Sequence, residues 1–272
     1  MLRITTLTLF SICLSILVEV RLDAQCHQGQ PIQNYQDRTI YKRNTERGLL
    51  GELQWDKVIE LSQPYFKPPY PYGFLEADFI KDWRLVETIG TSSEHPMAAL
   101  IIAVDSTARR GHTFYANYQF IKKSALLEGR IRKDDLKFYN RLLDVEGVST
   151  SEPSRAVEVC LLFLKAATHQ ERGFFIQIIS STSEIPSPSD DARRFGAIVW
   201  KQENTVMLSQ RQRKIEAASR VVSSPQFSKS GNKYELSFFT WDPVNGDVER
   251  WCMGVSRNSI TDVKREVIAE RL

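Results

Sequence analysis

The sequence is poor in the residues from which catalytic and metal-binding motifs are usually built. Its 272 residues include only four cysteines and four histidines, and the histidines are scattered along the chain. No stretch matches a phosphate-binding glycine loop, a zinc spacing, a calcium loop or the turn that carries a hydrolase nucleophile. Because none of these signatures is present, the sequence predicts neither a metal site nor a bound cofactor.

An excess of charge of one sign is lacking too. The chain has 36 basic and 33 acidic residues, which leave a formal net charge of +3. Domains that bind nucleic acid usually carry a strongly basic surface, so no nucleic-acid partner is expected. The basic run from Arg211 to Lys214 has no aromatic residues interleaved with it, and we interpret it as a solvated face.

Only one long apolar run is present, and it lies at the N-terminus. Arg3 precedes the run from Leu7 to Val18, and the small residue Ala24 follows it. This order is typical of a secretory signal peptide. The run is shorter than the ~20 residues that a membrane-spanning helix needs. The sequence therefore predicts a secreted or periplasmic protein, cleaved near Ala24, with no membrane span after cleavage. A retained membrane anchor is the alternative.

Cysteines are sparse in the mature chain that this cleavage would leave. Cys26, Cys160 and Cys252 remain. An exported chain meets an oxidising compartment, yet three cysteines are too few for a disulfide scaffold. The sequence thus predicts a fold held by its hydrophobic core, with at most one bridge. Cys160 and Cys252 lie in predicted regular structure and form the candidate pair. The alternative, which we slightly favour, is that all three are buried thiols.

Beyond residue 24 the chain divides into an arm and a folded region. Residues 25–47 are polar and aperiodic and predict an extended arm. Residues 48–272 predict one α+β domain, either as a single unit or as two lobes, 48–150 and 151–272. Apolar residues at helical spacing predict helices near 48–63, 133–143, 153–173 and 260–272. Branched and aromatic runs predict strands near 82–91, 96–106, 111–123, 173–183, 195–200, 233–241 and 248–256.

Most of these strands follow one another without a crossover helix, which favours antiparallel pairing. The expected fold class is α+β, with a mainly antiparallel sheet packed with a few helices, a C-terminal β-hairpin and a short terminal helix. Residues 203–222 fit the helical and the strand period equally well. Residues 64–74, "PYFKPPYPYGF", predict a stiff connector, or alternatively a polyproline ligand for an aromatic groove.

The stretch "TWDPVNGDVERW", residues 240–251, predicts a β-hairpin. Asn245-Gly246 between two apolar runs is typical of a two-residue type I′ turn. In that register Trp241 faces Arg250 on an outer, partly exposed face, where the guanidinium can stack on the indole. Both residues are candidates for binding a sugar or a peptide, although cross-strand pairing explains them without a site. A three-residue loop with a bulge at Gly246 would shift the pairing by one. The opposite face is the predicted core, with Leu236, Phe238, Trp251, Met253 and Val255.

The best catalytic candidate is "DSTARRGH", residues 105–112. Asp105, Ser106 and His112 would supply an acid, a hydroxyl and an imidazole, and Arg109 and Arg110 would bind an anion. Closeness in sequence does not make a catalytic triad, which is defined by geometry. The alternative is an ordinary polar turn between two strands.

The sequence as a whole predicts an exported, soluble protein with a non-enzymatic binding, interaction or scaffolding role. The expected partner is an extracytoplasmic protein, peptide or glycan. The alternative function is that of a secreted hydrolase that uses residues 105–112.

Overall fold

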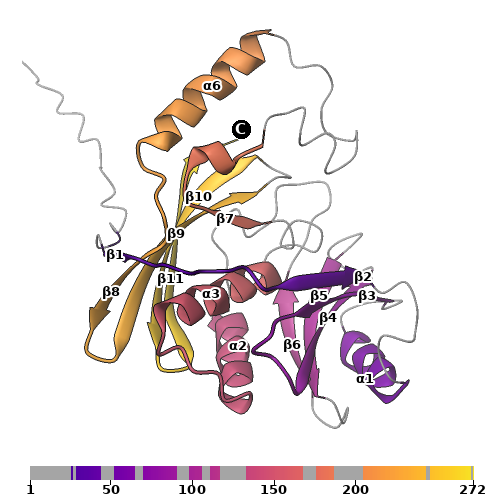
Figure 1. The fold of residues 1–272 in the computed structure, drawn as a ribbon. Coiled ribbons are helices and arrows are strands. Elements are labelled where there is room, and N and C mark those ends of the chain that lie inside the picture. The colour runs from indigo at the N-terminus through magenta and orange to yellow at the C-terminus, as the bar shows by residue number, and fades with distance from the viewer. Residues whose placement is uncertain are drawn as a thin grey trace, which may run out of the picture.

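Two antiparallel sheets and the helices that pack on them make up the fold (Figure 1). The structure is a computed structural model that describes residues 26, 29–43, 52–64, 70–90, 98–105, 111–116, 133–167, 176–186, 205–242, 246–270 and 272. Among the helices in these ranges, none is long and apolar enough to cross a membrane.

The first sheet, which we call the N-terminal sheet, has the strand order β2-β3-β4-β5-β6. These strands are β2 (Ile40–Arg43), β3 (Tyr70–Glu76), β4 (Trp83–Gly90), β5 (Ala98–Asp105) and β6 (Gly111–Ala116). Because side chains alternate along a strand, one face carries Phe74, Val86, Ile102 and Val104, all of which pack against Val58 of helix α1 (Glu52–Ser62).

The second sheet, the C-terminal sheet, has the order β1-β8-β9-β10-β11, with β7 also paired to β9. Its strands are β1 (Gln30–Pro31), β7 (Gln177–Ile179), β8 (Gln226–Ser230), β9 (Lys233–Asp242), β10 (Asp247–Ser256) and β11 (Ser259–Ala269). Helix α6 (Thr205–Ser219) covers one end of its outer face, where Phe239, Trp241 and Val248 are buried with Ile215 packed against them.

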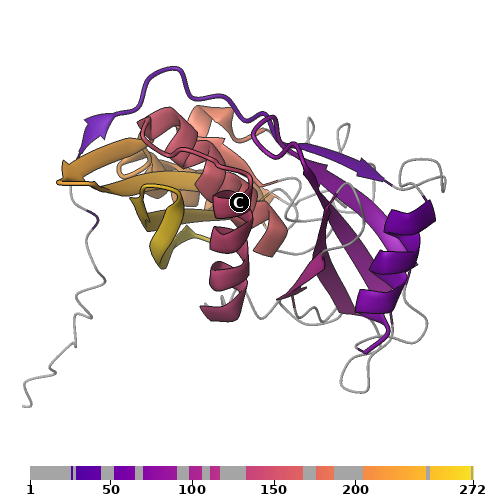
Figure 2. The ribbon, with the colours of Figure 1, turned by 90° about the horizontal axis from the view of Figure 1, so that it is seen from below.

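Two helices lie between the sheets: α2 (Lys133–Val145) and α3 (Pro153–Ala167) (Figures 1 and 2). Every residue from 156 to 166 of α3 is buried, as expected for a largely apolar helix, and the buried residues include the charged Glu158 and Lys165. The Tyr139 hydroxyl on α2 donates to the Val159 carbonyl of α3 at 2.7 Å. One hydrophobic cluster includes buried residues of both sheets and of both helices, so the sheets share a single core.

Residues 29–43 form a strap, named here the N-terminal strap, that crosses α3 from one sheet to the other (Figure 1). Its β1 pairs with β8, its β2 pairs with β3, and Ile32 between them is buried. The segment is extended. Asp37 of the strap accepts a hydrogen bond from the Lys165 ammonium of α3 at 2.6 Å.

A second charge cluster holds the strap near β3. Asp78 accepts from Arg155 at 2.7 Å and from Arg38 of the strap at 3.0 Å. These hydrogen bonds, the one from Arg155 above all, lower the pKa of Asp78 below its usual value. Burial raises the pKa of the nearby Glu158, although Arg155 opposes that shift. Asp37 and Arg38 thus hold the strap by ion pairs, although most of its polar side chains are exposed.

The predicted α+β class with mainly antiparallel sheets is confirmed. Helices α1, α2 and α3 match three predicted helices to within a few residues or are shorter than predicted, and strands β4, β5, β6, β7, β9 and β10 overlap predicted strands. Residues 203–222, which fit two periods, contain helix α6. The connector predicted for residues 64–74 is wrong from Tyr70 on, where β3 begins. The predicted signal peptide, residues 1–24, and the predicted strand 195–200 lie outside the described residues.

The predicted terminal helix, residues 260–272, is wrong, because β11 occupies this region and pairs with β10. Ile260 and Val263 are three residues apart, which suggested a helix. They share a face of the strand because a register shift opposite Gly254 and Val255 inserts one extra residue between them. A β-bulge therefore imitated helical spacing in the sequence.

Candidate functional site

The outer face of the C-terminal sheet has an apolar half and a polar half. Toward α6 it carries the buried cluster around Trp241. Away from α6, we call each row of residues that pair across neighbouring strands a rung. One rung consists of Gln226, Ser237, Cys252 and Lys264, from β8, β9, β10 and β11 in that order. The next rung, Ser228, Glu235, Gly254 and Asp262, is equally polar. No described helix covers this half.

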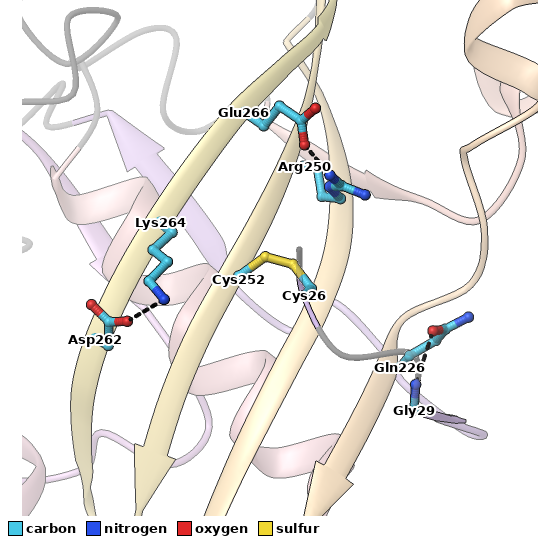
Figure 3. The surroundings of a disulfide bond; sticks show 8 residues. All are labelled: Cys26, Gly29, Gln226, Arg250, Cys252, Asp262, Lys264 and Glu266. Carbon is cyan, nitrogen blue, oxygen red and sulfur yellow. Dashed lines mark hydrogen bonds and ion pairs between the residues drawn. A yellow bond between two sulfur atoms is a disulfide. The ribbon is translucent and has the colours of Figure 1, made fainter. Parts of the chain in front are cut away.

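A disulfide joins Cys26 to Cys252 in the middle of this polar half (Figure 3). The two Cα atoms are 5.7 Å apart, within the usual range for a disulfide. Gly29 donates its backbone N–H to the Gln226 side chain at 3.3 Å, so residues 26 and 29 lie at two points of one rung. A Cβ atom on Gly29 would collide with the Phe227 carbonyl, so this close approach requires glycine.

The predicted cysteine pair was therefore wrong in one partner. Cys252 forms the bridge, but with Cys26, which was placed in the arm, and not with Cys160. The favoured alternative, three buried thiols, is wrong for Cys26 and Cys252. It is right for Cys160, a buried free thiol in α3 whose pKa is raised by burial. The sequence could not identify the pair, because a separation of 226 residues leaves no local signal.

Beside the disulfide the polar half is hollowed, with a volume of about 420 Å³. The hollow is centred on the rung that contains Gly254, which has no side chain to fill it. A Cβ atom on Gly254 would lie 2.5 Å from the Thr261 hydroxyl, so a larger residue there would require the Thr261 side chain to move. The lining residues are Ser228, Ser230, Lys233, Tyr234, Glu235, Cys252, Gly254, Thr261, Asp262 and Lys264.

The charges of the hollow are balanced. Lys264 and Asp262 are 3.4 Å apart, and both side chains are about half exposed. Arg250 pairs with Glu266 on the adjoining rung (Figure 3). Ammonium and hydroxyl donors thus lie beside carboxylate and hydroxyl acceptors. Such a surface suits a polar partner that both donates and accepts hydrogen bonds, and it favours no ion of one sign.

The inner face of the same strands carries a buried ion pair. Arg265 of β11 pairs with Glu249 of β10, and the guanidinium carbon lies 5.9 Å from the centre of the Trp251 ring. Burial raises the pKa of Glu249, while the arginine opposes this shift. Trp251 donates its indole N–H to the Thr240 hydroxyl at 2.9 Å. These contacts belong to the core between the sheet and α3.

The hairpin prediction was right about the faces and wrong about the register. Leu236, Phe238, Trp251, Met253 and Val255 are all buried in the core cluster, as predicted. However, Trp241 pairs with Val248, and Arg250 pairs with Phe239, so these two candidate binding residues do not face each other. The loop has four residues, 243–246, in place of two. Gly246 has φ +70° and donates its N–H to the Asp242 carbonyl at 2.7 Å.

Trp241 is also more buried than predicted, at 1% exposure, because α6 covers the face that was expected to be partly exposed. It therefore cannot serve as an exposed platform for a ligand. The register error of two residues preserved the faces, since side chains alternate with a period of two. Arg250 does lie on the polar half, beside the hollow, where its partner is Glu266.

The catalytic candidates lie at the β5–β6 connection of the N-terminal sheet, far along the chain from the hollow. Asp105 is buried at the end of β5, where it pairs with Trp83 of β4. His112 is the second residue of β6 and pairs with Ala103, and its side chain lies outside the described part. Ser106, Arg109 and Arg110 lie outside the described residues as well.

Within the described ranges, no three histidine, cysteine or acidic side chains are grouped as a metal site would require. The hollow itself could not have been found from the sequence, since its residues come from four strands and form no motif. No protein-family model, curated protein or solved structure matches this chain.

Proposed function

We propose that this protein is exported and acts outside the cytoplasm as a non-enzymatic binding protein. The proposed binding site is the hollow beside the Cys26–Cys252 disulfide, and the proposed partner is a glycan or a peptide of an extracytoplasmic protein. The hollow carries this proposal, because its mixed donors and acceptors match partners rich in hydroxyl or amide groups.

The disulfide supports the export part of the proposal. Stable disulfides form in oxidising compartments and are rare in the cytosol. Cys26 would be the second residue of a chain cleaved after Ala24. In that chain the bridge would fix the new N-terminus onto the sheet and at the edge of the hollow, so cleavage would leave no free arm across the proposed binding surface.

We expect the exported protein to begin at Gln25 and to contain Cys26 linked to Cys252. Mass spectrometry of the secreted form, digested without reductant, should detect the N-terminal peptide cross-linked to the peptide of β10. Reduction should release both peptides. A mature chain that begins at Met1 or Leu2, or a Cys26 found as a free thiol, would contradict the proposal.

If the partner binds in the hollow, a substitution that fills the hollow should abolish its binding. Ser230 is an exposed lining residue, so Ser230→Trp should fill the hollow without disturbing the core. Glycan or protein that co-purifies with the secreted wild type should be lost from this variant. Ser219→Trp, an equally exposed change at the end of α6, is the matched control and should retain it. Equal retention by both variants would show that the hollow is not the site.

A secreted hydrolase built on residues 105–112 is the second proposal. The buried carboxylate of Asp105 favours it, together with the β5–β6 register that pairs His112 with Ala103, two residues away. The variants above separate the two proposals. If the Ser230→Trp variant still hydrolyses a co-purified partner and the His112→Gln variant does not, the result favours the hydrolase.

A further inference from the structure

Strand β11 is an edge strand of the C-terminal sheet. One of its edges pairs with β10, and in the described ranges no strand pairs with the other. Such an edge presents backbone N–H and C=O groups that can pair with another strand. Its side chains are exposed or half-buried from residue 261 to residue 270, so this part of the edge is accessible.

Two side chains close the ends of this edge. At one end, Asn140 of α2 donates to the Ile260 carbonyl and accepts from the Ile260 N–H, both at 2.8 Å. At the other end, Lys214 of α6 donates to the Glu270 carbonyl at 2.7 Å. The open edge is therefore limited to residues 261–269, and its midpoint is Arg265.

The charges along the open edge are arranged about the same midpoint. Lys264 and Glu266 flank Arg265 and belong to the polar face of the sheet, in the rungs of Cys252 and Arg250. Val263 and Val267 lie one position further out, and Val267 is 40% exposed. Residues 263–267 thus have a valine at each end and residues of opposite charge next to the central arginine.

We propose that the open edge of β11 pairs with the same edge of a second copy of this chain, antiparallel and centred on Arg265. In a symmetric antiparallel pair, residues at equal distances on either side of the centre face each other. Lys264 would face Glu266 of the second copy, and Glu266 would face its Lys264. Val263 and Val267 would meet in the same way. The two pairs nearest the centre on each side would then be complementary.

Other symmetric registers are unfavourable. Centring on Lys264 would set that lysine against its own copy and Asp262 against Glu266. Centring on Glu266 would set two glutamates face to face. Centring on Val263 would match Asp262 with Lys264. However, the pairing would then extend to Ile260, whose backbone N–H and C=O are already hydrogen-bonded to Asn140. Like charges directly opposite are destabilising, so the charges exclude the two registers whose centres lie next to Arg265.

Arg265 would face its own copy at the centre, and this position is already neutralised. Its guanidinium pairs with Glu249 and lies over Trp251, so it reaches toward β10 and not toward the open edge. The two-fold axis would be perpendicular to the sheet. Both hollows would then lie on one side of a continuous sheet. The pairing itself does not depend on what the hollow binds.

The first test is the concentration dependence of the mass in solution. Sedimentation of the full chain, from low micromolar to several hundred micromolar, should show a reversible dimer. Lys264→Glu should raise the dissociation constant about tenfold or more, because two attractive pairs become repulsive. Lys42→Glu is the matched control, since Lys42 lies on β2, an edge strand of the other sheet, and is also ion-paired and about half exposed. It should leave the constant unchanged.

A charge swap separates pairing from misfolding. Lys264→Glu and Glu266→Lys should each be monomeric alone. An equimolar mixture should form a heterodimer, because each substituted residue then faces its opposite charge. A mixture of Lys264→Cys and Glu266→Cys copies should likewise cross-link on oxidation, while each alone should not. A wild type that stays monomeric throughout, or a swap that fails to restore the dimer, would overturn the proposal.

Discussion

Replacing Trp241 with alanine is expected to destabilise the protein about as much as replacing Trp251, by ~3–5 kcal/mol in each case. The two indoles lie on opposite faces of the C-terminal sheet, and both are almost fully buried, at 1% and 2% exposure. Trp241 fills the cluster beneath α6, and Trp251 fills the core against α3. Denaturant unfolding of both variants measures the two losses.

A pair of milder variants distinguishes the two sites. No described residue accepts a hydrogen bond from the indole N–H of Trp241, whereas that of Trp251 donates to the Thr240 hydroxyl. Trp251→Phe removes this bond and leaves the hydroxyl buried, so it should cost more than Trp241→Phe. Val221→Ala, at an exposed position, should have little effect. A small loss for Trp241→Ala would mean that α6 does not cover this face in solution.

Removing the disulfide is expected to have an effect of similar size. The bridge closes a loop with a sequence separation of 226 residues. Loop-closure entropy for such a loop gives a stabilisation of about 5 kcal/mol, which is an upper value for the measured loss. The double variant Cys26→Ser and Cys252→Ser should therefore unfold at a clearly lower denaturant concentration than the oxidised wild type.

Reductant supplies the control for this comparison. The reduced wild type should unfold like the double serine variant, and the double variant should not respond to reductant at all. Amide hydrogen exchange should also become faster in residues 29–43, because the disulfide anchors the N-terminal end of the strap. Unchanged unfolding of the wild type on reduction would show that the bridge does not contribute to the fold.

The sequence predicted those parts of the fold that depend on a single local pattern. Alternation of side chains identified β9 and β10 and their core face, because burial of Leu236, Phe238 and Trp251 is encoded by a period of two. It could not predict the register, since a glycine with positive φ fits both a two-residue turn and the end of a four-residue loop. β11 was taken for a helix because a bulge spaced its apolar residues by three.

The candidate site was beyond sequence reasoning for a different reason. Its residues are ordinary serines, lysines and acids that come together only through the strand order of the C-terminal sheet. Cys26 stood in a polar segment with no period of its own, and nothing local connects it to Cys252. Contacts between residues so distant in sequence depend on topology, which composition and spacing do not contain.

The wide separation of Cys26 and Cys252 in the sequence also determines when an exported chain can form its correct disulfide. Cys26 emerges first during synthesis, and its partner follows 226 residues later, so Cys160 is presented to it well before the correct cysteine. A cysteine reacts to form a disulfide as the deprotonated thiolate. Burial within α3 raises the pKa of Cys160 and keeps it protonated. Packing of the last strands against α3 would therefore protect the finished chain from exchange to the wrong bridge.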